Sequence, residues 1–409
     1  MDSSPRFKTS DRSPRLTIAG VAWVMLLSPF WANSEPFVPR EGSQVLERVR
    51  NGPTDEGASK LRELHARLAG DLNNLELASQ FARECIDRNR RESNPKYLGR
   101  AQAALAPWWN AINPPAEALI LRATIRQAQH EFRGALADLD LALRQRPRDA
   151  QAWLTRATVL TVLGDYPAAR RACFPLAQLA PGLLALSAAA NVSCLSGDAE
   201  GGCSALREAL NSYPHPDSTE RIWALTIHGE ASARLGHWHE AENSFKAALS
   251  IDPHDCYVLA AYADLLLDQG RAREVVSLLR EYRRIDGLLL RLALAEAQID
   301  RTSRSFRMAV ESLESRFEAG RLRGDFLHLR EQARFLLQLR SSPAEALRAA
   351  RENWQVQHEP ADARLLLECA RAARDAAAAE PVMAFLRVSH LQDVRLQQLT
   401  AELAAIASK

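Results

Sequence analysis

The sequence predicts an all-α protein built as an array of repeats. Three stretches of 32 residues, 116–147, 150–181 and 222–253, share one spacing of small, bulky and helix-breaking residues. Alanine, leucine and arginine are abundant, and β-branched residues form no alternating runs that would indicate strands. A chain of 409 residues usually forms two or three globular domains, but in a repeat array the length counts units instead.

A basic region followed by an apolar one opens the chain. Four basic side chains precede the run LTIAGVAWVMLL, and Ala32 and Ser34 supply small residues at positions −3 and −1 of a cleavage after Ser34. This order is typical of a secretory signal peptide, which we expect over 1–34. The apolar stretch of about 15 residues is shorter than the roughly 20 that a membrane-spanning helix needs. The alternative is an uncleaved membrane anchor over 16–31.

The charge of the chain argues against nucleic acid as a partner. The whole sequence is formally +2, and residues 1–34 carry that excess, so the remainder is neutral. Affinity for nucleic acid comes from neutralising phosphates, and a neutral chain offers no basic footprint. Five lysines against 47 arginines are typical of a GC-rich bacterial genome, so we expect an exported, periplasmic protein. Residues 35–56, rich in Pro, Gly and charge, predict an extended lead segment.

The three 32-residue stretches place residues of the same size at the same positions. The first helix has a large residue followed four positions later by a small one, and glycine stands in two of the turns. The second helix has an alanine and then a bulky residue, and proline closes each stretch. The matching residues are Leu119, Trp153 and Leu225; Ala123, Ala157 and Gly229; Gly164 and Gly236; Ala135, Ala169 and Ala241; Leu139, Cys173 and Phe245; Pro147, Pro181 and Pro253.

Each of these residue types has a physical reason. Small side chains let the two helices approach, and bulky ones fill the space beside them. Glycine accepts a positive φ at the turn, and proline cannot continue a helix. The pattern resembles the tetratricopeptide repeat (TPR) family, in its exported bacterial type. The resemblance implies a right-handed superhelical solenoid of antiparallel helix pairs over 57–387, with weaker copies at 182–214 and 254–285, and a C-terminal capping helix over 388–409.

Histidines around 228–254 raise the question of a metal site. His237 and His239 are two positions apart and point in different directions on a helix, and His228 holds a packed position of the first helix. No His-Glu pair is completed to H-E-x-x-H, and no Walker, dinucleotide-binding or G-x-S-x-G motif occurs. We therefore expect no metal, no cofactor and no catalytic residues. A metal-binding protein or hydrolase that uses these histidines is the less favoured alternative.

Cys194 and Cys203 lie at the end of one predicted helix and the start of the next, around the turn LSGDAEGG. In an oxidising compartment they can form a disulfide that clips the hairpin, if the register brings their Cβ atoms into range. The alternative is a pair of buried free thiols.

The family resemblance implies that a protein or peptide partner lies in the concave groove formed by the first helices. The side chains there are mostly apolar, Thr or small, which favours an amphipathic helix or an extended peptide. Packing against neighbouring helices is the alternative for any one of them. The groove positions are Ile120, Thr124, Leu154, Thr158, Leu186, Thr226, Glu230, Val258 and Tyr262.

The function that these observations predict is a non-enzymatic scaffold for protein interactions in the bacterial envelope. A stack of helix pairs offers a long curved surface and few catalytic loops. The alternative is a membrane-tethered assembly adaptor for secretion or polysaccharide export, held by an uncleaved N-terminal anchor.

Overall fold

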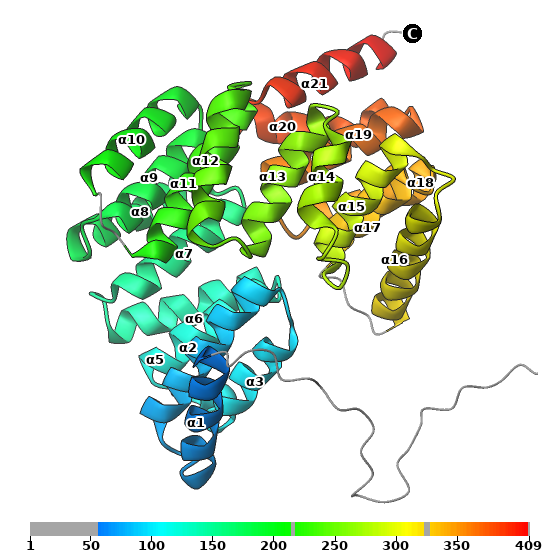
Figure 1. Cartoon of the computed structure of the whole chain (residues 1–409). Coiled ribbons are helices and arrows are strands. Elements are labelled where there is room, and N and C mark those ends of the chain that lie inside the picture. Colours follow the sequence, from blue (N-terminus) through cyan, green and yellow to red (C-terminus); the bar gives the residue numbers. More distant parts are fainter. Residues whose placement is uncertain (1–55, 214–216, 323–327, 408–409) are drawn as a thin grey trace, which may run out of the picture. The chain divides into compact units, whose positions relative to one another are not determined.

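Consecutive helices pack against one another as pairs along the chain (Figure 1). The computed structural model describes residues 56–213, 217–322 and 328–407, and the expected signal peptide, the anchor over 16–31 and all but the last residue of the lead segment lie outside these ranges. In the described ranges every regular element is a helix, so the predicted all-α class and the solenoid of antiparallel helix pairs are confirmed. No described helix is long and apolar enough to cross a membrane.

The helices follow in this order: α1 (Glu56–Gly70), α2 (Leu75–Glu92), α3 (Lys96–Ala104), α4 (Ala106–Trp109), α5 (Ala116–Ala128), α6 (Phe132–Gln145), α7 (Ala150–Val162), α8 (Tyr166–Leu179), α9 (Leu183–Leu195), α10 (Ala199–Ser212), α11 (Ser218–Arg234), α12 (Trp238–Ile251), α13 (Cys256–Asp268), α14 (Ala272–Leu279), α15 (Asp286–Ile299), α16 (Arg304–Leu322), α17 (Leu329–Gln338), α18 (Pro343–Trp354), α19 (Pro360–Ala373), the 3₁₀ helix η2 (Ala376–Ala379), α20 (Glu380–Ser389) and α21 (Val394–Ala407).

The three clearest repeats form the pairs α5–α6, α7–α8 and α11–α12. Gly164 and Gly236 end the first helices of two pairs with φ of 74° and 84°, a backbone conformation that favours glycine. Asp149 and Asp165 cap α7 and α8 by accepting backbone N–H groups of the first turn. In the third pair, Phe245 lies directly against Gly229, where a Cβ atom would come within 2.7 Å of the ring. The small and the bulky residue that the sequence pattern pairs in this repeat therefore contact each other in the structure.

The row of helix pairs curls until α13 meets α2, 165 positions earlier in the chain. Arg90 Nη1 donates a hydrogen bond of 3.1 Å to the buried carboxylate of Asp255, the residue that caps α13. Cys256 Sγ lies 3.2 Å from the carbonyl oxygen of Arg91. These contacts join the first helices to the middle of the array.

The C-terminal helices pack against the middle repeats and share a core with them. Buried side chains of α7–α9 and of α18–α21 form one hydrophobic cluster, which includes Leu160 and Leu396. His358 N donates to the carbonyl oxygen of Val162, and His358 Nδ1 lies 2.8 Å from that of Leu163. In a simple solenoid each unit contacts only its neighbours. Here the C-terminal segment adds contacts across the array, and α21 occupies most of the expected capping segment 388–409.

Candidate functional site

The curled helices surround an open cavity of about 1130 Å³. Its wall comes from α2 and α3, the end of α5, α11–α13, the start of α15, α17, α19, the turn before α21 and the start of α21. The cavity exceeds the roughly 300–1,000 Å³ of small-molecule sites and has room for a peptide segment. Because helices form most of the wall, its side chains are held on rigid elements.

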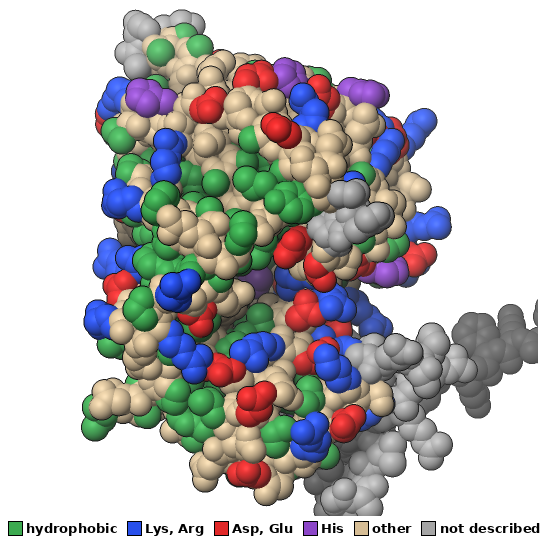
Figure 2. Space-filling view, turned by 90° about the vertical axis from the view of Figure 1, so that its left-hand side faces the viewer, with side chains coloured by type: hydrophobic (Ala, Val, Ile, Leu, Met, Phe, Trp, Pro, Cys, Tyr) green, Lys and Arg blue, Asp and Glu red, His purple; other side chains and the backbone are tan. Residues whose placement is uncertain are grey.

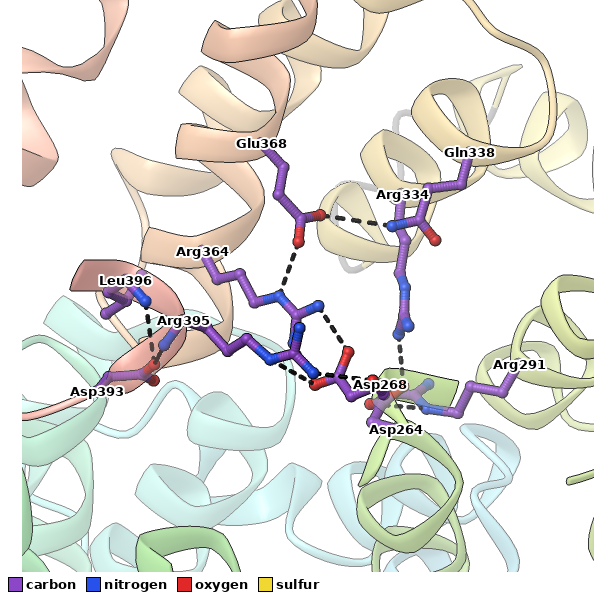
Figure 3. A network of polar contacts seen from close by, with 10 residues as sticks. All are labelled: Asp264, Asp268, Arg291, Arg334, Gln338, Arg364, Glu368, Asp393, Arg395 and Leu396. Carbon is purple, nitrogen blue, oxygen red and sulfur yellow. Dashed lines mark hydrogen bonds and ion pairs between the residues drawn. The ribbon is translucent and has the colours of Figure 1, made fainter. Parts of the chain in front are cut away.

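Acidic and basic residues form a network across this cavity (Figure 3). Asp264 of α13 accepts hydrogen bonds of 3.0 and 2.6 Å from Arg291 and of 2.6 Å from Arg334. Asp268, one turn further along α13, accepts two from Arg364, of 2.6 and 2.7 Å. Arg395 donates to the carbonyl oxygen of Asp268 at 2.8 Å. The network thus ties α13 to α15, α17, α19 and α21.

The arginines keep Asp264 ionised. Burial raises the pKa of this carboxyl, but the charges of Arg291 and Arg334 outweigh it and lower the pKa to about 2, against an ordinary value of 3.8. At neutral pH the centre of the network is therefore a carboxylate between two guanidinium groups.

A second ion cluster fixes α17 against α19. Arg330 Nε and Nη2 donate to the two oxygens of Asp362 at 2.6 and 2.8 Å, and Arg330 also contacts Glu359. Asp362 is buried and accepts a further hydrogen bond of 2.6 Å from Asn353. Bidentate arginine–carboxylate pairs fix orientation as well as distance, so this cluster positions the part of the wall that α19 supplies.

Another part of the wall combines aromatic and small side chains from α11–α13. Tyr257 is 58% exposed in the cavity, and its hydroxyl donates a hydrogen bond of 2.8 Å to Glu230. Burial raises the pKa of Glu230. Trp238, Ala260 and Ala261 continue this wall, and the small alanines leave room beside the rings.

Of the predicted groove residues, Glu230 lines the cavity in the described structure, and the other eight do not. Ile120, Thr226, Val258 and Tyr262 are buried between helices. Thr124, Thr158 and Thr226 donate their hydroxyls to the carbonyl oxygens one turn earlier in their own helices. Leu154 packs against the shared core of the middle and C-terminal helices, and Leu186 is 45% exposed on α9.

The three histidines near the third repeat have separate partners. His228 is buried with Nδ1 2.8 Å from Ser244 Oγ, and burial lowers its pKa. His237 lies 3.6 Å from Glu200, and His239 lies 3.2 Å from Asn243. Within the described ranges, no group of three or more His, Cys, Asp or Glu side chains is arranged to hold a metal ion.

Cys194 and Cys203 are buried free thiols whose side chains face each other across the turn between α9 and α10. The hydrogen bond between them, together with burial, raises the pKa of Cys194, and the same bond lowers the pKa of Cys203. Gly202 leaves the space for this contact, because a Cβ atom there would overlap the sulfur of Cys194.

Figure 2 shows one face of the molecule, with several Lys and Arg side chains down its left-hand side. Hydrophobic side chains gather over its upper middle part, and acidic and basic side chains are interspersed around and below them.

Neither the models of known protein families nor the curated proteins match the sequence. Among solved structures, the chain is similar to a tetratricopeptide repeat protein from Parabacteroides merdae, at 18% identity and a TM-score of 0.37 over 58% of this chain and 93% of that one. It is similar to a Rap protein complexed with Competence and Sporulation Factor, at 15% identity and a TM-score of 0.44 over 86% of this chain and all of that one.

A third similar structure is PilW, a type IV pilus biogenesis factor, at 16% identity and a TM-score of 0.30 over 69% of this chain and 97% of that one. At these identities the likeness concerns the helix-pair fold alone. The three pairs described above show independently that this chain folds as antiparallel helix pairs.

Proposed function

We propose that this chain is a non-enzymatic scaffold that holds a segment of a partner protein in the central cavity. The observation that carries the proposal is an open cavity of about 1130 Å³ whose wall combines aromatic and small side chains with ionised ones. Such a wall suits an extended peptide, because the apolar part accepts side chains and the polar part orients them. The ion pairs across α13, α17 and α19 keep the wall in place without a ligand.

We further propose that the scaffold works in the bacterial envelope. The support is the basic and then apolar segment 1–34 with small residues before Glu35. Sequencing the mature N-terminus from the native host tests this location. Glu35 as first residue supports export, and an intact N-terminus with the protein in the membrane fraction favours the tethered adaptor instead.

Site-specific photo-crosslinking in the native host tests partner binding in the cavity. A benzophenone amino acid replaces Tyr257, which is exposed inside the cavity, or Val388, which is 82% exposed on α20 and does not line it. We expect discrete protein adducts from position 257 and none of the same size from position 388. Identical adducts from both positions, or adducts from position 388 alone, contradict binding in the cavity.

A further inference from the structure

A second, smaller cavity of about 300 Å³ lies between α1, α2 and α3, the first helices of the array (Figure 1). Three arginines and a histidine surround it together with a leucine and a tyrosine. The six residues of this basic pocket are Leu61, Arg62, His65, Arg88, Tyr97 and Arg100. None of these six described residues is acidic, and none lines the central cavity. The basic pocket is therefore a recess of its own, separate from the proposed peptide site.

Arg88 is the buried cation of the basic pocket, with 9% of its side chain exposed. Its Nη1 donates a hydrogen bond of 2.8 Å to one oxygen of Glu92, and the hydroxyl of Tyr97 donates to the other at 3.0 Å. Glu84 lies 3.9 Å from Arg88 Nε and pairs with Lys60 at 2.9 Å. Both carboxylates beside the pocket are thus already engaged, and they hold Arg88 in place.

Arg62 and Arg100 are the exposed cations of the basic pocket. Within the described ranges, neither guanidinium forms an ion pair or a hydrogen bond. The charge of Arg100 extends into the protein: burial raises the pKa of the Cys85 thiol to about 11, and Arg100 is the strongest influence that opposes this rise. A recess lined by charges of one sign concentrates their field on an anion inside it. Two guanidinium groups therefore remain available to such an anion.

We propose that the basic pocket binds a phosphate monoester, carried by a small soluble molecule or by a lipid headgroup. A phosphate monoester has nearly two negative charges at neutral pH and three acceptor oxygens. The guanidinium groups of Arg62 and Arg100 match that charge, and each presents a planar fork of donors that suits phosphate. A carboxylate has one charge and two oxygens, so it would leave one of these two arginines without a partner.

The size and lining of the basic pocket fit the same ligand class. A volume of about 300 Å³ is at the lower end of small-molecule sites, with room for a phosphate group and a short carbon chain. Leu61 and Tyr97 are buried and supply an apolar surface for such a chain. His65 is exposed at the pocket and adds a further polar side chain for the oxygens. We therefore expect glycerol 3-phosphate to fit.

Calorimetry on the full-length protein, in a buffer without phosphate, tests this assignment. The probes are glycerol 3-phosphate and acetate, and we expect the first to bind at least about tenfold more tightly. Sedimentation with phosphatidylcholine vesicles then distinguishes the two sources of the group. The vesicles contain phosphatidic acid, a phosphate monoester, or phosphatidylglycerol, a diester. A preference for phosphatidic acid assigns the group to a lipid headgroup, and no preference between the two vesicles assigns it to a soluble molecule.

A double variant and a matched control locate the binding. Arg62→Gln/Arg100→Gln removes both available charges and should weaken the binding of glycerol 3-phosphate at least about tenfold. Arg67→Gln is the control, because Arg67 is exposed on the same helix as Arg62 and does not line the pocket. It should bind as the wild type does. Without ligand, the double variant should unfold at no lower temperature than the wild type, because two like charges are gone from one recess.

The assignment is overturned if acetate binds as tightly as glycerol 3-phosphate, or if the double variant binds glycerol 3-phosphate as tightly as the wild type. A loss of binding in Arg67→Gln equal to that in the double variant also overturns it, because the attraction would then come from the charge of the whole surface. An unliganded double variant that unfolds at a lower temperature than the wild type would show that the two arginines are paired in solution, with the same consequence. Each of these outcomes leaves the proposed scaffold function intact, since the basic pocket and the central cavity share no residue.

Discussion

Arg364 of α19 and Asp268 of α13 are joined by two hydrogen bonds of 2.6 and 2.7 Å, although 96 positions separate them in the sequence. Arg364 also donates to Glu368, one turn further along its own helix, at 2.7 Å. The pair connects a helix from the middle of the repeat array with a helix of the C-terminal segment (Figure 3). This ion pair therefore holds together two helices, α13 and α19, that line the cavity.

We expect Arg364→Met to lower the free energy of unfolding by about 1–3 kcal/mol, since Asp268 and Glu368 lose their shortest hydrogen bonds. Asp268 then keeps only Arg395 Nε at 3.9 Å, and Glu368 keeps only Gln338 Nε2 at 3.4 Å. Urea denaturation followed by circular dichroism measures the change.

The control is Arg387→Met, whose ion pair with Glu380 has both side chains more than 60% exposed. That substitution should change stability by less than about 0.5 kcal/mol. Equal effects of the two substitutions would contradict a role for Arg364 in closing the cavity.

The helix pairs could be predicted from the sequence because their signals are local. The small residue at 229 and the bulky one at 245 lie 16 positions apart within one repeat, and their sizes alone indicate that two helices meet. Glycines at 164 and 236 mark turns by the backbone conformation they permit. Such local signals can be recognised in a single sequence.

The cavity could not be predicted because it depends on how far the array curls. The contact of Arg90 with Asp255 spans 165 positions, and no local pattern encodes it. The predicted groove positions lie on the first helices, where the family resemblance places a concave face. In the structure Val258 and Tyr262 are buried, and charged residues of α17 and α19 line the cavity. The sequence signals that part of the wall only by its many arginines. Their number does not indicate which of them meet at the cavity.

Replacing glycine by alanine should have opposite effects on the stability of the folded protein at two helical positions. At Gly229 of α11, a Cβ atom would lie 2.7–3.0 Å from the ring of Phe245, so Gly229→Ala should lower stability by about 1–3 kcal/mol. At Gly99 of α3, nothing lies within 4 Å of the added atom. Gly99→Ala should raise stability by roughly 0.5–1 kcal/mol, because alanine loses less backbone freedom in a helix. Thermal unfolding of both variants checks the prediction, and a neutral Gly229→Ala would show that the ring can move.

Asp264 should contribute stability that disappears in acid. Its pKa in the folded protein is about 2, below the ordinary 3.8, so the contribution is present above pH 4 and is lost as the pH falls toward 2. The difference in pKa corresponds to roughly 2 kcal/mol. Asp264→Asn should therefore be less stable than the wild type at pH 6, and the gap should narrow between pH 4 and pH 2.

Unfolding midpoints across this pH range measure that gap. Asp140→Asn is the control, because Asp140 forms an ion pair with Arg156 with its own side chain 49% exposed. The unfolding midpoint of Asp140→Asn should differ little from that of the wild type at every pH. A gap for Asp264→Asn that stays constant down to pH 2 would mean that the carboxylate is not held ionised by its arginines.

Cys194 and Cys203 should form a disulfide when the protein refolds in the presence of a donor disulfide such as oxidised glutathione, since both thiols are buried in the folded chain. One thiolate attacks glutathione disulfide and forms a mixed disulfide with release of glutathione thiolate, and the second cysteine then displaces the other glutathione as the hairpin brings the two side chains face to face. The closed loop is short, so we expect a gain of roughly 2–3 kcal/mol in unfolding free energy. Reduction with dithiothreitol should remove the gain.

Non-reducing peptide mapping should recover the peptides of Cys194 and Cys203 as one species. The four other buried cysteines, Cys85, Cys173, Cys256 and Cys369, should be alkylated as free thiols after unfolding. The variant Cys194→Ala/Cys203→Ala supplies the matched control, because oxidant should leave its unfolding midpoint unchanged. If both thiols of the oxidised wild type can still be alkylated after unfolding, the facing sulfurs do not react, and the hairpin is held by packing alone.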